Sequence, residues 1–256
     1  MKKLILTLLL LLLTINAYAF SVSIDPPSIN SKAKPGAIAS NQITVENTAK
    51  EPIILKVYLE DWEYQEDGSK KFFKLGTTPY SLKNYAKLYV KELRLAPGAK
   101  ENVQVDITSP TDKTGGLYGV VLFEASPVLV NKSANVKLIG RIGTILYHEI
   151  DGTQTYNFDV AYLKNSQGSG RSQLLFNFIN KSNIHLKLTG SLLILGKNHA
   201  IADRIEVVLK ALPNSEQKII LNSTKKLLPG EYSALFSLNY LEDKSFNKEV
   251  KVNITK

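Results

Sequence analysis

The chain has 256 residues, of which 44% are hydrophobic, and it carries 32 lysines and arginines against 23 aspartates and glutamates. It contains no cysteine, which excludes disulfides, thiol catalysis and zinc-thiolate sites. The basic residues are scattered and form no cluster with aromatic residues, so the composition argues against a nucleic-acid partner.

The chain begins with the pattern of a secretory signal peptide, residues 1–19. Lys2 and Lys3 precede an apolar run at 4–15, and the small-residue site that follows predicts cleavage after Ala19. The run is shorter than the roughly twenty residues that a membrane-spanning helix needs, and no second run reaches that length. We therefore expect a periplasmic protein without a transmembrane segment in the mature chain, with the cell surface as the alternative location. Without the two signal lysines, thirty basic residues face twenty-three acidic ones, so the mature chain is near +7.

The mature sequence has the pattern of β structure along most of its length. Short runs rich in Val, Ile, Leu, Phe and Tyr alternate with turns that contain Gly, Pro, Asn, Asp or Ser. Only 80–89 has a pattern compatible with a short helix. Many short strands at this spacing predict β-sandwiches rather than a doubly wound sheet. In chain order, the predicted strands are 42–46, 53–59, 103–107, 118–124, 135–147, 174–178, 186–195, 218–221, 232–240 and 249–254.

Three landmarks recur in the same order in the two halves of the chain. Each half has an asparagine at the end of a strand, then a proline turn that leads into a strand, and then a glycine closely followed by a tyrosine. The repeat predicts two immunoglobulin-like antiparallel β-sandwich domains, residues 20–150 and 151–256, which meet near Asp151. The landmarks are Asn47, Pro97 and Tyr118 in the first half and Asn180, Pro213 and Tyr232 in the second.

The landmark residues have structural roles in such sandwiches. An asparagine at a strand end can hold the following turn with its side chain. Tyr118 and Tyr232 stand where a tyrosine corner is expected, in which the phenol hydroxyl bonds to the chain a few residues upstream. Trp62 is the single tryptophan, and we expect it to pack in a core.

Four segments, taken in order, resemble the N-terminal domain of the PapD-like pilus-assembly chaperones. They are the start at 22–27, the strand end at 46–48, the proline turn at 95–98 and the long strand at 135–147. The resemblance is strongest over 20–150 and continues more weakly into the second half, where that family has a second sandwich set at an angle. It implies a periplasmic chaperone that binds fimbrial or other surface subunits during assembly at the cell envelope. An outer-membrane usher would be a further partner.

In that family, the last strand of the first domain is donated to the subunit, which is a form of β-strand addition. The corresponding strand here is 135–147, and the resemblance makes Val136 and Leu138 the apolar side chains that fill the subunit's groove. The same side chains could instead line the domain's own core, because one alternating strand does not show which of its faces is open.

The family also anchors the subunit's terminal carboxylate between its two domains, with one basic residue on the first strand and one on the last. Arg141 stands at the last-strand position, and its guanidinium can hold a carboxylate through two parallel hydrogen bonds. The first-strand position falls near Ser28, so half of the pair is missing. The alternative interpretation of Arg141 is a solvated residue at the end of a strand. The candidate client-binding residues are therefore Arg141, Val136 and Leu138.

The sequence offers no catalytic, cofactor-binding or metal-binding motif. His148, His185 and His199 lie in separate segments without zinc-ligand spacing, and no serine stands beside a histidine in a way that suggests catalysis. The acidic residues between 60 and 67 lack the glycine and the alternating ligands of a calcium loop, so we expect a solvated hairpin there. We expect a protein that is not an enzyme and that needs no cofactor.

A second hypothesis is a structural or adhesive immunoglobulin-like module of the cell surface, without chaperone activity. The glycines and the phenylalanine in 115–123 resemble a pattern of the WxL-interacting proteins of bacterial cell surfaces. That family normally ends in a membrane-spanning helix and a basic tail, and the last residues of this sequence show neither pattern. This difference favours the chaperone hypothesis.

Overall fold

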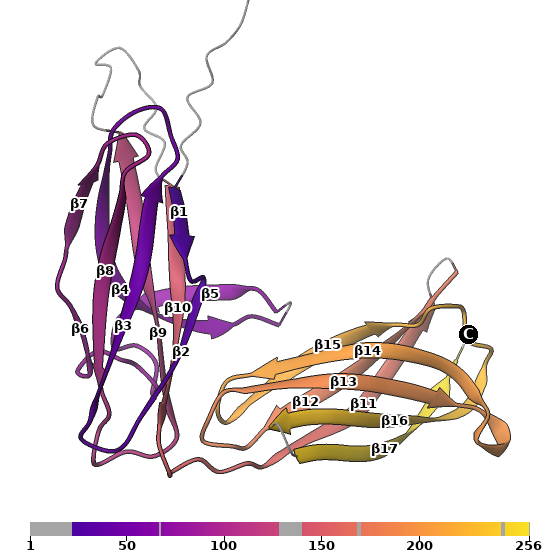
Figure 1. Cartoon of the computed structure of the whole chain (residues 1–256). Coiled ribbons are helices and arrows are strands. Elements are labelled where there is room, and N and C mark those ends of the chain that lie inside the picture. Colours follow the sequence, from indigo (N-terminus) through magenta and orange to yellow (C-terminus); the bar gives the residue numbers. More distant parts are fainter. Residues whose placement is uncertain (1–21, 67, 128–139, 168–169, 242–243, 256) are drawn as a thin grey trace, which may run out of the picture.

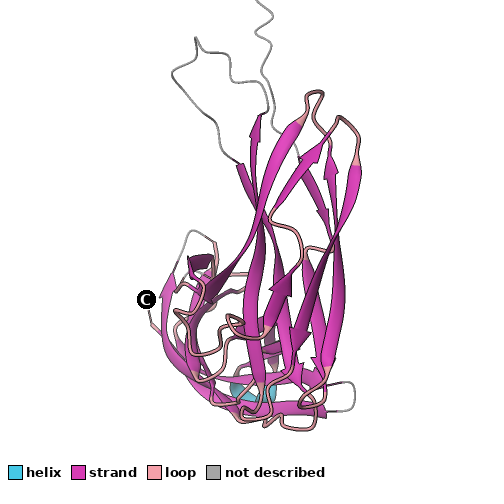
Figure 2. Cartoon of the chain, turned by 90° about the vertical axis from the view of Figure 1, so that its left-hand side faces the viewer, coloured by secondary structure: helices cyan, strands magenta, loops and turns pink. Residues whose placement is uncertain are grey.

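The computed structural model describes residues 22–66, 68–127, 140–167, 170–241 and 244–255. Figure 1 shows two elongated β-sandwiches joined at an angle, and the only helical segment coloured in Figure 2 is one short turn. That turn is the three-residue 3₁₀ helix η1, Lys197–His199. No helix among the described residues has the length and apolar character needed to cross a membrane. The predicted all-β fold with two sandwiches is therefore confirmed.

The first sandwich contains strands β1 to β10 in two sheets. One sheet has the strand order β1-β3-β8-β6, and the other has the order β2-β10-β9-β4-β5, with β7 paired to the first residues of β4. The strands are β1 (Val22–Asp25), β2 (Ser28–Ala33), β3 (Ile38–Asn47), β4 (Ile53–Tyr64), β5 (Lys70–Lys74), β6 (Ala86–Leu88), β7 (Glu92–Leu95), β8 (Lys100–Thr108), β9 (Gly116–Pro127) and β10 (Gly140–Ile150).

The second sandwich contains strands β11 to β17. Its sheets have the orders β11-β12-β15 and β14-β13-β16-β17, and within the described ranges no sheet contains strands of both sandwiches. The strands are β11 (Phe158–Gln167), β12 (Ser172–Asn180), β13 (Leu186–Leu195), β14 (Ile201–Ala211), β15 (Ser215–Asn222), β16 (Gly230–Leu241) and β17 (Lys244–Ile254).

The start of the chain passes from one sheet of the first sandwich to the other. β1 pairs antiparallel with β3, and after two prolines β2 pairs with β10, from Ser28 opposite Ile145 onward. This second pair is parallel, an exception within the antiparallel sandwich that the sequence predicts. The physical reason is that the chain keeps its direction while it changes its partner.

Alternation of apolar and polar residues builds a separate core in each sandwich. In β12, the buried residues Leu174, Phe176 and Phe178 alternate with partly exposed ones. The ring of Phe176 packs edge-to-face against Phe236 of the opposite sheet, with 5.0 Å between the ring centres. Side chains from two inner faces thus meet in one layer, as they do in β-sandwiches generally.

The predicted strands are all present where the structure describes them, although 135–139 lies outside the described residues. The segment 80–89 is not a helix, and it forms turns followed by β6. Leu82 is fully buried and Tyr85 packs against the first core, so tertiary burial overrides the local helical pattern. Several further strands were not predicted, namely β1, β2, β5, β6, β7, β11 and β14.

The repeated asparagines hold equivalent turns, as predicted. The side-chain amides of Asn47 and Asn180 each donate at 2.9 Å to the carbonyl four residues downstream. Each also donates at 3.1 Å to a carbonyl just before the proline turn, that of Leu95 in the first sandwich and that of Ala211 in the second. The sequence repeat is therefore a repeat of buried hydrogen bonding.

The two tyrosine landmarks differ from each other. Tyr232 donates its hydroxyl to the carbonyl of Leu228 at 3.0 Å, which confirms a tyrosine corner. The prediction is wrong for Tyr118, whose hydroxyl accepts a hydrogen bond at 2.5 Å from the backbone N–H of His185 in the second sandwich. The phenol reaches this position because Gly116 has no side chain, and an added Cβ there would lie 2.0 Å from the Tyr118 hydroxyl.

His148 has two serine neighbours that the sequence did not predict. The Ser31 hydroxyl lies 2.8 Å from Nδ1 and the Ser109 hydroxyl 2.7 Å from Nε2. Burial lowers the pKa of His148 to about 4, so the ring is neutral near pH 7. All three side chains are buried, which makes this group a structural tie between β2, β10 and the chain after β8.

The predicted solvated hairpin contains one buried acid, Asp61. Its carboxylate accepts hydrogen bonds from the backbone N–H groups of Gly76, Thr77 and Thr78 at 3.0, 2.8 and 2.8 Å, and from the Ser81 hydroxyl at 2.7 Å. The expectation is therefore wrong for Asp61, because the loop that follows β5 folds back over this carboxylate.

Candidate functional site

The first residues of β10 have an open edge. Residues 140–144 pair with β9 on one side, whereas β2 joins the other side only from Ile145 onward. Within the described part of the chain, no strand pairs with that free side. About half of the backbone N–H and C=O groups of such a segment point away from its single partner and can pair with a further strand.

Of the three predicted client-binding residues, the structure describes one. Val136 and Leu138 lie in 128–139, outside the described residues. Arg141 is the second residue of β10 and stands directly opposite Glu124 of β9.

Ile142 is an exposed apolar residue of β10 that was not among the residues predicted from the sequence. It is 36% exposed, although Leu146 and Ile150 of the same strand are fully buried. Ile142 is four positions after Leu138, so a continuous strand would place the two side chains on one face. The alternating pattern that drew attention to Leu138 therefore also contained the signal for Ile142.

Arg141 lies on the face of its sheet that is turned toward the second sandwich. It is six residues from Tyr147, so the two share a face, and the Tyr147 ring lies 4.5 Å from the ring of His185 in the second sandwich. The same spacing places Arg141 about 20 Å along the strand from that contact. Arg141 is therefore not at the bottom of the angle between the sandwiches.

Arg141 has an acidic neighbour of its own. Its Nη1 lies 3.7 Å from Oε1 of Glu60, and 47% of its side chain is exposed. The neighbouring Tyr58 hydroxyl and, more weakly, Glu60 raise the pKa of Arg141. Tyr58 also donates a hydrogen bond at 3.0 Å to Glu124. An incoming carboxylate would therefore exchange with Glu60, and an exposed pair of this kind contributes little to stability.

The two positions expected for the family's basic pair do not meet. Ser28 stands opposite Ile145, four residues beyond Arg141, which is about 13 Å along the strand. The first-strand position of the family's basic pair is therefore occupied by Ser28, which carries no positive charge.

Aromatic side chains fill the bottom of the angle between the sandwiches. Trp62 is 1% exposed, and its ring packs edge-on against Tyr64 at 5.0 Å and against Tyr147 at 5.6 Å. Burial of Trp62 is as predicted, but it occurs on the outer face of the first sandwich rather than in a sandwich core. We call this group the inter-sandwich cluster, and its members are Trp62, Tyr64, Tyr80, Tyr118, Tyr147, His185 and Leu212.

Hydrogen bonds reinforce the contact between the sandwiches. Tyr80 donates its hydroxyl to the carbonyl of Pro213 at 2.8 Å, and the Tyr64 hydroxyl lies 3.3 Å from Nε2 of His185. The backbone N–H of Gly116 donates to the carbonyl of Asn183 at 3.0 Å. The two sandwiches are therefore held together by packing within the inter-sandwich cluster and by hydrogen bonds around it.

Three lysines lie near the inter-sandwich cluster. Burial, followed by the charges of Lys210, Lys70 and Lys187, lowers the pKa of His185 to about 3, so its ring is neutral. Lys187 and Lys210 stand directly opposite each other on β13 and β14, and the ammonium of Lys70 lies 5.7 Å from the centre of the Trp62 ring. Among the described residues these three lysines make no ion pair.

No protein-family model matches the chain, and no curated protein matches its sequence. Solved structures match its fold over 90% of its length. A chain from a chaperone–tip adhesin complex of CFA/I fimbriae biogenesis has a TM-score of 0.52 at 12% identity, with 98% of that chain covered. The YadV chaperone has a TM-score of 0.51 at 12% identity with 98% covered, and the class 5 fimbriae chaperone CfaA has 0.50 at 13% with 99% covered. The likeness is one of fold, and it confirms the predicted resemblance to the two-sandwich architecture of the PapD-like chaperones.

Proposed function

We propose that the mature chain is a periplasmic chaperone-like protein that binds fimbrial or other surface subunits by β-strand addition. The open edge of β10 at residues 140–144 is the observation that carries this proposal. The proteins of similar fold named above are chaperones rather than enzymes, which supports a non-catalytic role for this chain.

In this proposal a strand of the subunit pairs with the free side of β10 and with the segment before it. Backbone hydrogen bonds supply most of the affinity, and side chains two residues apart supply the specificity. Leu138 and Ile142 point toward the subunit's groove, together with Val136. Arg141 holds a carboxylate of the subunit after exchange with Glu60.

We further propose a processed, two-domain chain. Residues 1–19 are removed on export, and residues 20–150 and 151–256 form the two domains, which is supported by the separate cores of the two sandwiches. An outer-membrane usher would take the subunit over from this protein. The alternative, a cell-surface module without chaperone activity, predicts no subunit binding at all.

The test uses small secreted subunits encoded beside this gene, together with the mature protein in pull-down and melting experiments. We expect Leu138→Asp and Ile142→Asp to abolish capture and to leave the Tm unchanged within a few degrees, because a side chain that awaits a partner is cheap to change. Arg141→Ala should weaken capture about fivefold without changing the Tm. Ile201→Asp is the control, since Ile201 is 66% exposed on the second sandwich, and it should change neither quantity.

Loss of folding in Ile142→Asp and Leu138→Asp, beside an unaffected Arg141→Ala, would show that these side chains belong to the protein's own core. Wild-type protein that captures none of the subunits would favour the cell-surface alternative.

A further inference from the structure

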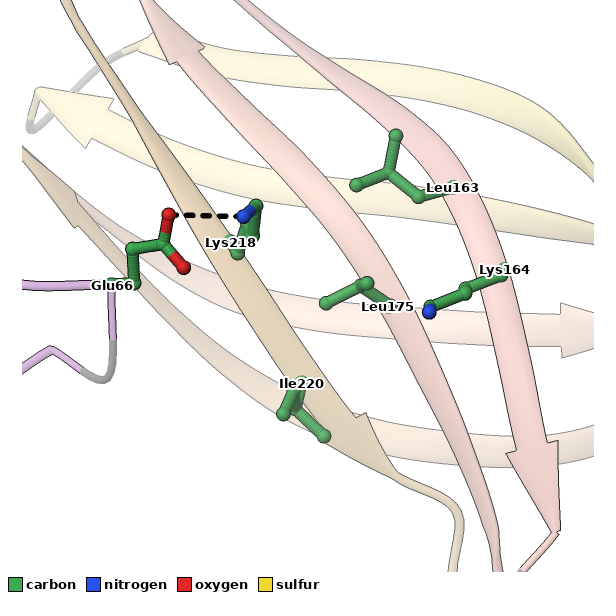
Figure 3. Close-up of a pocket in the computed structure, with 6 residues that line it drawn as sticks. All are labelled: Glu66, Leu163, Lys164, Leu175, Lys218 and Ile220. Carbon is green, nitrogen blue, oxygen red and sulfur yellow. Dashed lines mark hydrogen bonds and ion pairs between the residues drawn. The ribbon is translucent and has the colours of Figure 1, made fainter.

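The outer face of the sheet β11-β12-β15 carries an apolar pocket with basic walls (Figure 3). Lys164, Leu175 and Ile220 form one row across the three strands, because Lys164 pairs with Leu175 and Leu175 with Ile220. Leu163 is the extra residue of a bulge in β11 and adds a second apolar side chain beside the row. The hollow above them has a volume of about 610 Å³.

The apolar side chains of this pocket are unusually exposed for a sheet that covers its own core. Leu163 is 47% and Ile220 is 60% exposed, whereas the residues of β12 that face inward are fully buried. The solvent-facing side of an antiparallel sheet is normally polar. Adjacent apolar groups on this face, flanked by charged side chains, can cover the apolar side chains of a partner.

The pocket already holds one carboxylate, which comes from the first sandwich. Glu66, at the tip of the β4–β5 hairpin that reaches toward the second sandwich in Figure 1, places Oε1 3.0 Å from Nζ of Lys218. Both side chains are largely exposed, at 81% and 51%, so the pair is weak and can be exchanged. Lys164, also in the wall, makes no ion pair with any described residue.

The pocket is connected to the inter-sandwich cluster. A second hollow of about 290 Å³ shares Glu66, Leu163 and Lys218 with it and extends to Tyr64 of the inter-sandwich cluster. The face of β10 that carries Arg141 borders the same cluster through Tyr147. A subunit on β10 could therefore extend a segment into this pocket.

We propose that this pocket binds an extended segment of the client subunit in which an aspartate or glutamate stands beside apolar side chains. The carboxylate pairs with Lys164 and replaces Glu66 on Lys218, while the apolar groups cover Leu163, Leu175 and Ile220. A second copy of this chain fits less well, because an isologous contact would bring the lysines of both copies together. The inference rests on the proposed chaperone function for the identity of its occupant.

The test is an NMR titration of the isotope-labelled mature protein with synthetic peptides of ten residues. A peptide of alternating leucine and glutamate should shift the amides of β11, β12 and β15 around Leu163, Leu175 and Ile220. The matched peptide of leucine and glutamine should bind about fivefold more weakly, and this difference should shrink at high salt. In the double variant Lys164→Gln, Lys218→Gln the two peptides should bind equally.

Two further variants have matched controls on β14. Glu66→Gln removes the internal competitor and should tighten binding of the acidic peptide about two- to fivefold, whereas Glu206→Gln, in an exposed pair with Arg204, should not. Ile220→Ser should weaken binding, whereas Val208→Ser, at a residue that is 55% exposed on the other sheet, should not.

Shifts centred on another face, equal binding of the two peptides by the unaltered protein, or self-association through this face would each overturn the inference. Subunit capture separates it from the function on which it rests. If Ile142→Asp abolishes capture while Ile220→Ser and the double lysine variant leave it unchanged, the pocket inference is wrong and the chaperone function stands. If the unaltered protein captures no subunit, the proposed chaperone function is wrong. A client segment then cannot be the occupant of the pocket either.

Discussion

Single buried polar side chains decide how the chain turns between strands. Asn47 and Asn180 each satisfy backbone carbonyls in two separate segments, so they join a turn to the proline segment that packs beside it. A buried carbonyl without a donor costs about 1–3 kcal/mol, which is a large share of the stability of a domain. We therefore expect each of these two asparagines to contribute substantially to the stability of its sandwich.

We expect Asn180→Ala to lower the free energy of unfolding by about 2–4 kcal/mol, because the carbonyls of Ile184, Ala211 and Leu212 lose their donor. Chemical denaturation followed by tryptophan fluorescence and circular dichroism measures this change. Asn102→Ala is the control, because the Asn102 side chain only accepts an exposed hydrogen bond from Thr44, and its effect should stay within about 0.5 kcal/mol. Equal losses in both variants would contradict the role assigned to Asn180.

His148 should make stability depend on pH. Its folded-state pKa is lowered from 6.5 to about 4, so in the window between these values the unfolded chain binds a proton that the folded chain does not. The free energy of unfolding should therefore fall as the pH drops from about 7 to about 4, by at most roughly 3 kcal/mol, and this contribution should level off below.

His185, with its pKa lowered to about 3, acts in the same direction, so a comparison of variants is needed to isolate His148. Unfolding curves at a series of pH values should show a shallower dependence in His148→Gln than in the unaltered protein. His199→Gln, at an exposed position, should keep the original slope. An unchanged slope in His148→Gln would show that the ring is not the group that titrates.

At the scale of elements, the sequence predicted which segments are strands, but it did not predict which strands pair with each other. The alternation in 174–178 and 186–195 reports burial of one face, and both segments are strands. The change of sheet between β1 and β2 depends on which partner edges are free after the sandwich closes, and no local pattern contains that information. The same reason explains why the open edge of β10 could not be read from its residues.

The β4–β5 hairpin illustrates the limits of local patterns. Its acidic residues looked like one solvated group, yet Asp61 is buried and Glu60 and Glu66 pair with Arg141 and Lys218. The two glutamates form ion pairs with the basic side chains that we expect to bind the subunit. The hairpin is therefore an internal competitor at both places where we expect an acidic partner.

At the scale of the whole molecule, the inter-sandwich cluster holds the two sandwiches in one arrangement. Leu212 of the second sandwich packs among residues of the first and is 5% exposed. Burial of aromatic rings and of Leu212 at this contact resembles a core rather than a flexible linker interface. A subunit would therefore meet a preformed angle between the sandwiches.

We expect Leu212→Ala to uncouple the two sandwiches, because it removes the apolar side chain that the second sandwich contributes to this contact. Calorimetry should show one unfolding transition in the unaltered protein and two in the variant. The free energy of unfolding for the first transition of the variant should be lower by about 2–4 kcal/mol. Leu228→Ala is the control, since Leu228 is 76% exposed in the second sandwich. A single transition in Leu212→Ala would mean that other contacts set the angle.

The sequence by itself determined the all-β class, the two-sandwich plan, the repeated asparagine turns and the tyrosine corner at Tyr232. These features follow from local periodicity and turn chemistry, which a short window of residues contains. Only the tertiary structure decided that Tyr118 bonds to His185, that His148 lies between two serines and that Arg141 stands about 20 Å from the inter-sandwich cluster. Each of these depends on residues far apart in the chain, whose meeting is set by sheet register and by the angle between the sandwiches.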